Sequence, residues 1–180
     1  MSELDDILHK YRVFRDSQAI VRECIAQESD LLTGTVFFSR TKKESTQALK
    51  KLGETIELLA VLDIVAYFES KLSQYIEDTI RPYEKAMLPP SGFARKLYQY
   101  IQDNAEKWRF DDKLELFKEE IDQHILSEAK KLYKFRNWIA HGQRTQKPSN
   151  YTPEEAKEAV EKFLQAFPLL SVSNTNDPLV

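Results

Sequence analysis

Residues Lys130–Gln143 read KKLYKFRNWIAHGQ, and the prediction of the fold starts from the helix that this stretch closes. Apolar side chains recur every three or four residues before and within it, as they do on one face of an α-helix. They are Leu114, Phe117, Ile121, Ile125, Ala129 and Leu132. The same count leads to Arg136, so a cation occupies a position where the pattern predicts an apolar side chain. Because burying an unpaired charge is strongly unfavourable, Arg136 must have a partner or line a solvated cleft.

The predicted helix ends near His141. Gly142 favours an end there, because glycine readily adopts the left-handed conformation that closes many helices. Residues five apart on a regular helix are separated by roughly 140°, so Arg136 and His141 do not share a face while the helix continues. We expect His141 to lie at the helix terminus, where its ring is free to turn toward the guanidinium.

Composition predicts one ordinary globular domain. The 180 residues are 42% hydrophobic and 31% charged, which is enough for one core, and we expect a single domain over residues 1–170 with a loose tail at 171–180. No apolar run approaches the ~20 residues of a membrane helix, and Met1–Lys10 does not resemble a signal peptide, so a cytoplasmic location is expected. Cys24 is the single cysteine, which leaves no internal disulfide or multi-cysteine zinc site, and we expect it to pack.

Positive charge is concentrated around the motif, although the net charge of the chain is −3. No carboxylate occurs between Glu128 and Glu154. The cations in that interval are Lys130, Lys131, Lys134, Arg136, Arg144 and Lys147, and the aromatic residues among them are Tyr133, Phe135, Trp138 and Tyr151. Some of these rings could stack on unpaired bases; in the plainer interpretation, most of them are core and the lysines form a solvated face.

Helical periodicity elsewhere predicts an all-α bundle of about five or six helices. Ser2 is a plausible N-cap for the first helix, and Thr152 to Glu155 form a capping box for the last. The expected helices cover Ser2–Gln27, Lys43–Ile80, Phe93–Trp108, the stretch from Asp111 to His141, and the stretch from Pro153 to Pro168.

Three segments between these helices are predicted to be non-helical. Leu31–Arg40 is ambiguous, and our best interpretation is a loop that carries Val36–Phe38 into the core. Arg81–Gly92 contains three prolines and is expected to be an extended connection. Gln143–Tyr151 is polar and is predicted to be a loop beside the motif.

Two carboxylates interrupt the apolar stripes of the long helix Lys43–Ile80. Glu69 falls on the stripe of Leu62, Val65, Leu72 and Ile76, and Asp63 falls on the adjoining stripe. Either Glu69 or Asp63 could pair with the inward Arg136, and such a pair would hold the guanidinium in place for an incoming phosphate. The alternative is a buried structural ion pair with no catalytic role.

The Arg–x4–His spacing, with Asn137 directly after the Arg, at the end of a helix in an all-helical chain, resembles the HEPN family of RNA-cleaving and nucleotide-binding domains. The resemblance covers the helical order of most of the chain, and specific residues at Arg136, Asn137 and His141, with Glu69 as a looser parallel. It implies a homodimer that brings two motifs together, and a toxin or antiphage role with a possible antitoxin or regulatory partner. One toxin branch has, two residues after the His, a Tyr that a nucleotidyltransferase antitoxin modifies. Gln143 stands there in this chain, so that modification is not expected.

The motif suits metal-independent cleavage of RNA, in which a 2′-hydroxyl attacks the neighbouring phosphate and a 5′-hydroxyl leaves. His141 would move the proton, Arg136 would hold the phosphate oxygens as charge builds, and Asn137 would orient the substrate or the ring. Lys130, Lys134 and Arg144 would bind the RNA backbone.

No cofactor or metal is expected at this site, because His9, His124 and His141 lack the spacing of a helix-borne metal site. Two alternatives to the enzyme stay open. One is a catalytically silent helical module that dimerises or binds nucleotide or RNA, and the other is an unrelated bundle with a structural arginine.

Overall fold

The computed structural model describes residues 2–86, 92, 96, 100, 107–144 and 146–166. The regular elements in these residues are all helical, which confirms the predicted all-α bundle. They are α1 (Glu3–Ala26), a short 3₁₀ turn η1 (Asp30–Leu32), α2 (Lys42–Ala86), α4 (Phe110–Glu115), α5 (Gln123–Ala140) and α6 (Pro153–Ala166). None of the described helices combines the length and apolar character that a membrane crossing requires.

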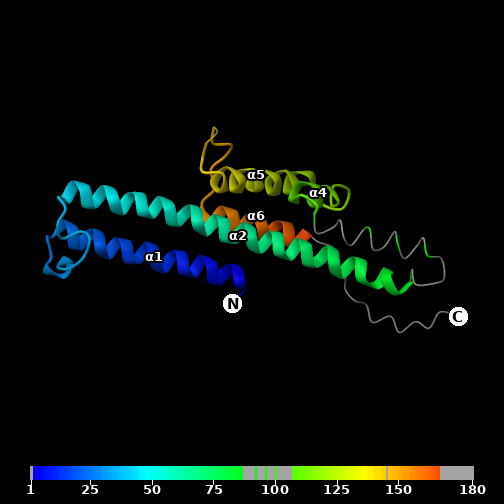
Figure 1. The fold of residues 1–180 in the computed structure, drawn as a ribbon, viewed down its shortest axis with the longest axis horizontal. Helices are drawn as coiled ribbons and strands as arrows, with labels where there is room; N and C mark the ends of the chain where they lie inside the picture. Colours follow the sequence, from blue (N-terminus) through cyan, green and yellow to red (C-terminus); the bar gives the residue numbers. More distant parts are fainter. Residues whose placement is uncertain are drawn as a thin grey trace.

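The helix α2 runs through the whole arrangement, and the other helices pack along it (Figure 1). Its partner α1 lies antiparallel to it, while α4, α5 and α6 gather beside the middle and C-terminal part of α2. In consequence, much of α1 and the first half of α2 project as a two-helix arm beyond the other helices.

The starts of three helices follow from their capping residues. The Ser2 hydroxyl accepts from the Asp5 amide at 3.1 Å while the Asp5 carboxylate accepts from the Ser2 amide at 3.0 Å. The same reciprocal pair of hydrogen bonds joins Thr41 and Glu44 at the start of α2. It joins Thr152 and Glu155 at the start of α6. The capping box predicted at Thr152 is therefore confirmed.

Predictions for the middle of the chain are confirmed only in part. The long helix extends to Ala86 rather than ending at Ile80, so the first half of the segment predicted to be extended is helical. Pro82 lies inside it, and the loss of one backbone hydrogen bond there does not end the helix. The predicted helix Phe93–Trp108 falls mostly outside the described residues, as do Phe167, Pro168 and the predicted tail at 171–180.

The prediction of one continuous helix from Asp111 to His141 is wrong. The chain forms the short α4 and then a turn over residues 116–122, after which α5 starts anew at the N-cap Asp122. The Asp122 carboxylate accepts from the amide of His124 at 2.8 Å. The apolar periodicity continues through the break because tight turns keep Phe117 and Ile121 buried in the core.

The core lies where α2, α4, α5 and α6 meet. Phe68 of α2 is 1% exposed and makes edge-on contacts with Phe110 of α4 and Phe163 of α6, at ring distances of 5.1 and 5.0 Å. Phe135 of α5 and Leu114 of α4 are also fully buried there.

The prediction that Val36–Phe38 enters the core is wrong. Val36 and Phe38 are 68% and 64% exposed, and Phe37 is half-buried. This loop closes the outer end of the arm, away from the main core, and the buried apolar residues near it are Ile25 of α1 and Leu49 of α2. Cys24, on the same arm, is a free and half-buried thiol.

Candidate functional site

The end of α5 is built by a hydrogen-bonded C-terminal turn. The Gly142 amide donates to the Ile139 carbonyl at 3.0 Å, and the Gln143 amide donates to the Trp138 carbonyl at 2.9 Å. Gly142 has φ +72°, as the left-handed closure of a helix requires. His141 is the C-cap residue, so the predicted end of the helix is confirmed.

Arg136 is held by a hydrogen bond with one side chain and an ion pair with another. Its Nη1 donates to Asn137 Oδ1 at 3.1 Å, and its Nη2 lies 3.5 Å from Glu69 Oε2 of α2. The Tyr133 ring lies beside the guanidinium, with its centre 5.9 Å from Cζ. Arg136 and Glu69 are both about 30% exposed, at 30% and 29%, so the predicted pair between the two helices exists and is partly open to solvent.

The Glu69 carboxylate is a weak counterion. Burial raises the pKa of Glu69, and the charges of Arg136 and Lys113 offset this effect only in part. The 3.5 Å separation from Arg136 is at the long end for a hydrogen bond. Glu69 therefore positions the guanidinium through a long, loose pair.

His141 is exposed, and it lies apart from the Arg136 pair. Among the described residues, no hydrogen bond or ion pair joins the imidazole to the guanidinium or to any other side chain. His141 directly follows Ala140, the last residue of α5, and at φ −86° and ψ 15° its backbone leaves helical values mainly in ψ, which lies beyond its own Cβ. The separation of roughly 140° between positions five apart is thus nearly retained.

The exposed face of α5 instead groups His141 with other predicted site residues. Four of these residues follow one another at steps of four, three and four positions, which places them on one face of the helix. They are Lys130, Lys134, Asn137 and His141. Lys134 and His141 are exposed, and Asn137 is half-buried. Because its amide oxygen accepts from Arg136, Asn137 connects this face, hereafter the basic face, with the Arg136–Glu69 pair.

The other predicted RNA-binding residues differ in their surroundings. Lys130 forms an ion pair with Glu115 of α4, so part of its charge is neutralised within the fold. Arg144 is exposed in the segment after α5. Asp63, the other carboxylate on an apolar stripe of α2, is exposed, and so are Leu52 and Leu59 of the same stripe, at 42% and 47%.

The aromatic residues near the motif belong mainly to the core, as the plainer interpretation held. Phe135 is 0% exposed and Tyr151 is 8% exposed. Phe135 stacks on the half-buried Trp138, with Lys147 lying over both rings. The buried rings of Phe135 and Tyr151 are therefore not accessible to a nucleic-acid base.

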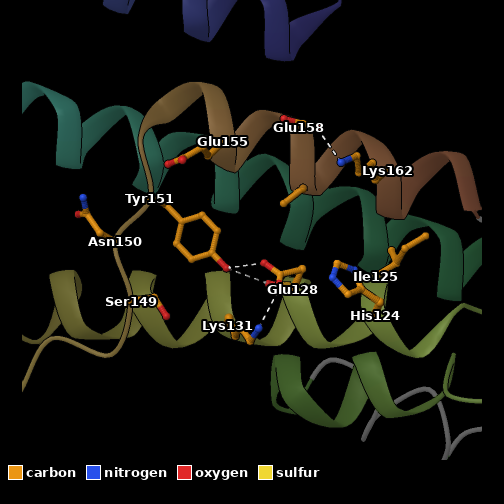
Figure 2. Close-up of a pocket in the computed structure, with 11 residues that line it drawn as sticks. His124, Ile125, Glu128, Lys131, Ser149, Asn150, Tyr151, Glu155, Glu158 and Lys162 are labelled. Atoms are coloured by element: carbon orange, nitrogen blue, oxygen red, sulfur yellow. Dashed lines mark hydrogen bonds and ion pairs between the residues drawn. The ribbon is translucent and has the colours of Figure 1, made fainter.

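A hollow of about 450 Å³ lies between α5, α6 and residues 149–151 (Figure 2). The Tyr151 hydroxyl lies at its base and donates to Glu128 Oε2 at 3.2 Å. Lysines at its rim, Lys131 and Lys162, pair with carboxylates of their own helices. The hollow is lined by the α5 positions 124, 125, 128 and 131 and by none of Arg136, Asn137 and His141. It is a separate feature, and its charged groups are largely paired.

Two residues near Glu69, Lys113 and Ser73, were not predicted from the sequence. Lys113 of α4 donates to Ser73 Oγ of α2 at 2.9 Å, one helical turn from Glu69, and its charge acts on the Glu69 carboxyl. No local pattern marks Lys113, since its position depends on the unpredicted turn after α4.

Comparison of the chain with protein-family models, with curated proteins and with solved structures finds no match.

Proposed function

We propose that this protein is a metal-independent RNA endonuclease of HEPN type, with Arg136 and His141 as its catalytic residues. The observation that carries the proposal is the exposed His141 at the end of a helix face bearing Lys134 and Asn137, with the half-buried Arg136 hydrogen-bonded to that Asn137. Cationic side chains on one face favour the phosphate backbone of a nucleic acid. A ring that is free in solvent is available for proton transfer.

In the proposed reaction the 2′-oxygen of a ribose attacks the adjacent phosphorus, and the bond to the 5′-oxygen breaks. This gives a 2′,3′-cyclic phosphate and a 5′-hydroxyl. His141 takes the 2′-hydroxyl proton or gives one to the leaving oxygen. Arg136, held by Glu69 and Asn137, donates to the phosphate oxygens as negative charge accumulates.

A second copy of the chain completes the proposed site. Within one chain, Arg136 and His141 emerge on faces of α5 separated by roughly 140°. In a homodimer, the His141 of one subunit acts on a phosphate held by the Arg136 of the other. The RNA substrate and a protein that restrains the activity are the partners this proposal includes.

The test is cleavage of an unstructured RNA in the presence of a chelator. We expect His141→Ala to lower the rate by about 10²–10⁴ and Arg136→Ala to lower it similarly. His9→Ala and Arg22→Ala, which alter exposed residues of α1, are the matched controls and should leave the rate unchanged. Equal loss in the controls, or cleavage that the two motif variants retain, contradicts the proposal.

Mixing the two inactive variants tests the composite site. When subunits exchange, a dimer of one Arg136→Ala and one His141→Ala chain retains one site with both wild-type residues. We expect activity to return in the mixture but in neither variant alone. A mixture that stays inactive after shown exchange of subunits rules out the shared site.

The second candidate is an RNA-binding module without catalysis. It is favoured by the absence of a hydrogen bond between the Arg136 and His141 side chains and by the structural pairing of Arg136 with Glu69. It predicts that RNA binds and that Arg136→Ala weakens binding, while no cleavage occurs. The same assay, read together with binding, separates the two candidates.

A further inference from the structure

One face of α2 holds two cations from two other helices. Glu69 and Ser73 are four residues apart, so they lie on the same face about 5–6 Å from each other at Cβ. Glu69 pairs with Arg136 of α5, and Ser73 accepts from the Lys113 ammonium of α4 at 2.9 Å. Arg136 and Lys113 are thereby lined up along α2.

The charges of this cluster do not balance. Arg136 and Lys113 contribute two positive charges, and Glu69 contributes at most one negative charge. Within the described part of the chain, no carboxylate lies within ion-pair distance of Lys113, whose own hydrogen bond goes to a neutral hydroxyl. The cluster therefore has a net positive charge in a half-buried place, where attraction for an anion is stronger than in bulk water.

Both cations keep donors for a ligand. A guanidinium has five N–H donors and an ammonium has three. In the described region Arg136 uses one toward Asn137 and one, at a long distance, toward Glu69, while Lys113 uses one toward Ser73. Several donors on each side chain remain open to phosphate oxygens.

We propose that Lys113 is a second phosphate-binding residue of the Arg136 site, holding the phosphate of single-stranded RNA next to the one that Arg136 holds. This rests on the proposed function, because it requires RNA at Arg136. The spacing of the two anchors along α2 suits consecutive phosphates of one strand, and the basic face of α5 continues the cationic surface beyond Arg136.

The experiment measures binding of a fluorescent 2′-O-methyl oligouridine, which cannot be cleaved because its 2′-oxygens are blocked. Fluorescence anisotropy of the full chain over a range of salt concentrations gives Kd and its salt dependence. We expect Lys113→Met to raise Kd on the order of 10-fold and to reduce the slope of log Kd against log salt by about 0.7, as the loss of one phosphate contact requires. Lys113→Arg should restore both values.

Lys118→Met is the matched control, because Lys118 is an exposed lysine in the turn directly after α4. Thermal unfolding followed by circular dichroism checks that Lys113→Met is folded. A folded Lys113→Met with the Kd and slope of wild type, or with no larger change than Lys118→Met, overturns the proposal. So does a wild-type chain that does not bind the oligonucleotide.

The two proposals fail separately. If RNA cleavage depends on Arg136 but Lys113→Met binds RNA like wild type, the proposed role of Lys113 is wrong. The proposed endonuclease activity is not affected by that result. Binding that depends on Lys113 without any cleavage removes the endonuclease and leaves the phosphate site.

Discussion

Arg136 and Glu69 form a pair whose weakness suits a ligand-binding arginine. A strong buried ion pair would have a short separation and a carboxyl pKa below its ordinary value. Here the separation is 3.5 Å and burial raises the pKa of Glu69 above 4.5. A phosphate can therefore compete with Glu69 for the guanidinium without breaking a tight pair.

The pair could be predicted from the sequence because both residues interrupt apolar stripes at inward positions. The same reasoning failed for Asp63, which also interrupts a stripe of α2 but is exposed. A stripe shows which residues share a face and leaves open whether another element covers that face.

The raised pKa of Glu69 gives a pH-dependent prediction. A carboxyl whose pKa is raised by folding favours the folded state at low pH, and this contribution is lost as the pH rises through the folded pKa. We therefore expect the free energy of unfolding of wild type, relative to Glu69→Gln, to fall as the pH rises above the ordinary carboxyl pKa of 4.5. Urea denaturation of both proteins at several pH values measures the difference. A difference that rises with pH would mean that the pair with Arg136 outweighs burial.

At the scale of the element, α5 is defined by its two ends. Its C-terminus was predictable, since Gly142 carries a recognisable local signal. Its N-terminus was not, because the apolar count from Leu114 to Leu132 runs through residues 116–122 without interruption. Asp122 was the available signal for a new start, but a single capping residue inside a strong periodic pattern does not outweigh the pattern.

Gly142 is expected to stabilise the C-terminal end of α5. Its φ of +72° disfavours L-residues, while an added Cβ would meet no atom within 4 Å. We expect Gly142→Ala to lower the free energy of unfolding by about 1 kcal/mol. Gly142→Asn should cost less, because asparagine tolerates the left-handed conformation. Urea denaturation of the two variants compares them, and equal stabilities for wild type and Gly142→Ala would contradict this view of the turn.

At the scale of the whole molecule, the core and the motif share one end of a long pair of helices. The arm of α1 and the first half of α2 lies outside this core and exposes apolar side chains, among them Ile20, Leu52 and Leu59. Composition and periodicity predicted the helical bundle but not this uneven distribution. Both helices carry apolar stripes along their length, and only the packing of α4, α5 and α6 shows where a stripe becomes core.

Phe68 and Phe38 illustrate the difference in burial between the core and the arm. Phe68 is 1% exposed and contacts rings of α4 and α6, whereas Phe38 is 64% exposed at the end of the arm. We expect Phe68→Ala to lower the free energy of unfolding by about 3–5 kcal/mol and Phe38→Ala to change it by less than about 0.5 kcal/mol. Urea denaturation provides both values. A large loss in Phe38→Ala would mean that the arm loop packs more closely than described.

We propose that Arg136 and His141 cleave RNA by attack of its own 2′-hydroxyl, and the decisive measurement identifies the new ends of an RNA incubated with the protein in chelator. We expect 2′,3′-cyclic phosphate and 5′-hydroxyl ends, and no cleavage of the same strand made with 2′-deoxy sugars. Ends bearing a 5′-phosphate, cleavage of the deoxy strand, or activity that requires an added metal ion would contradict it.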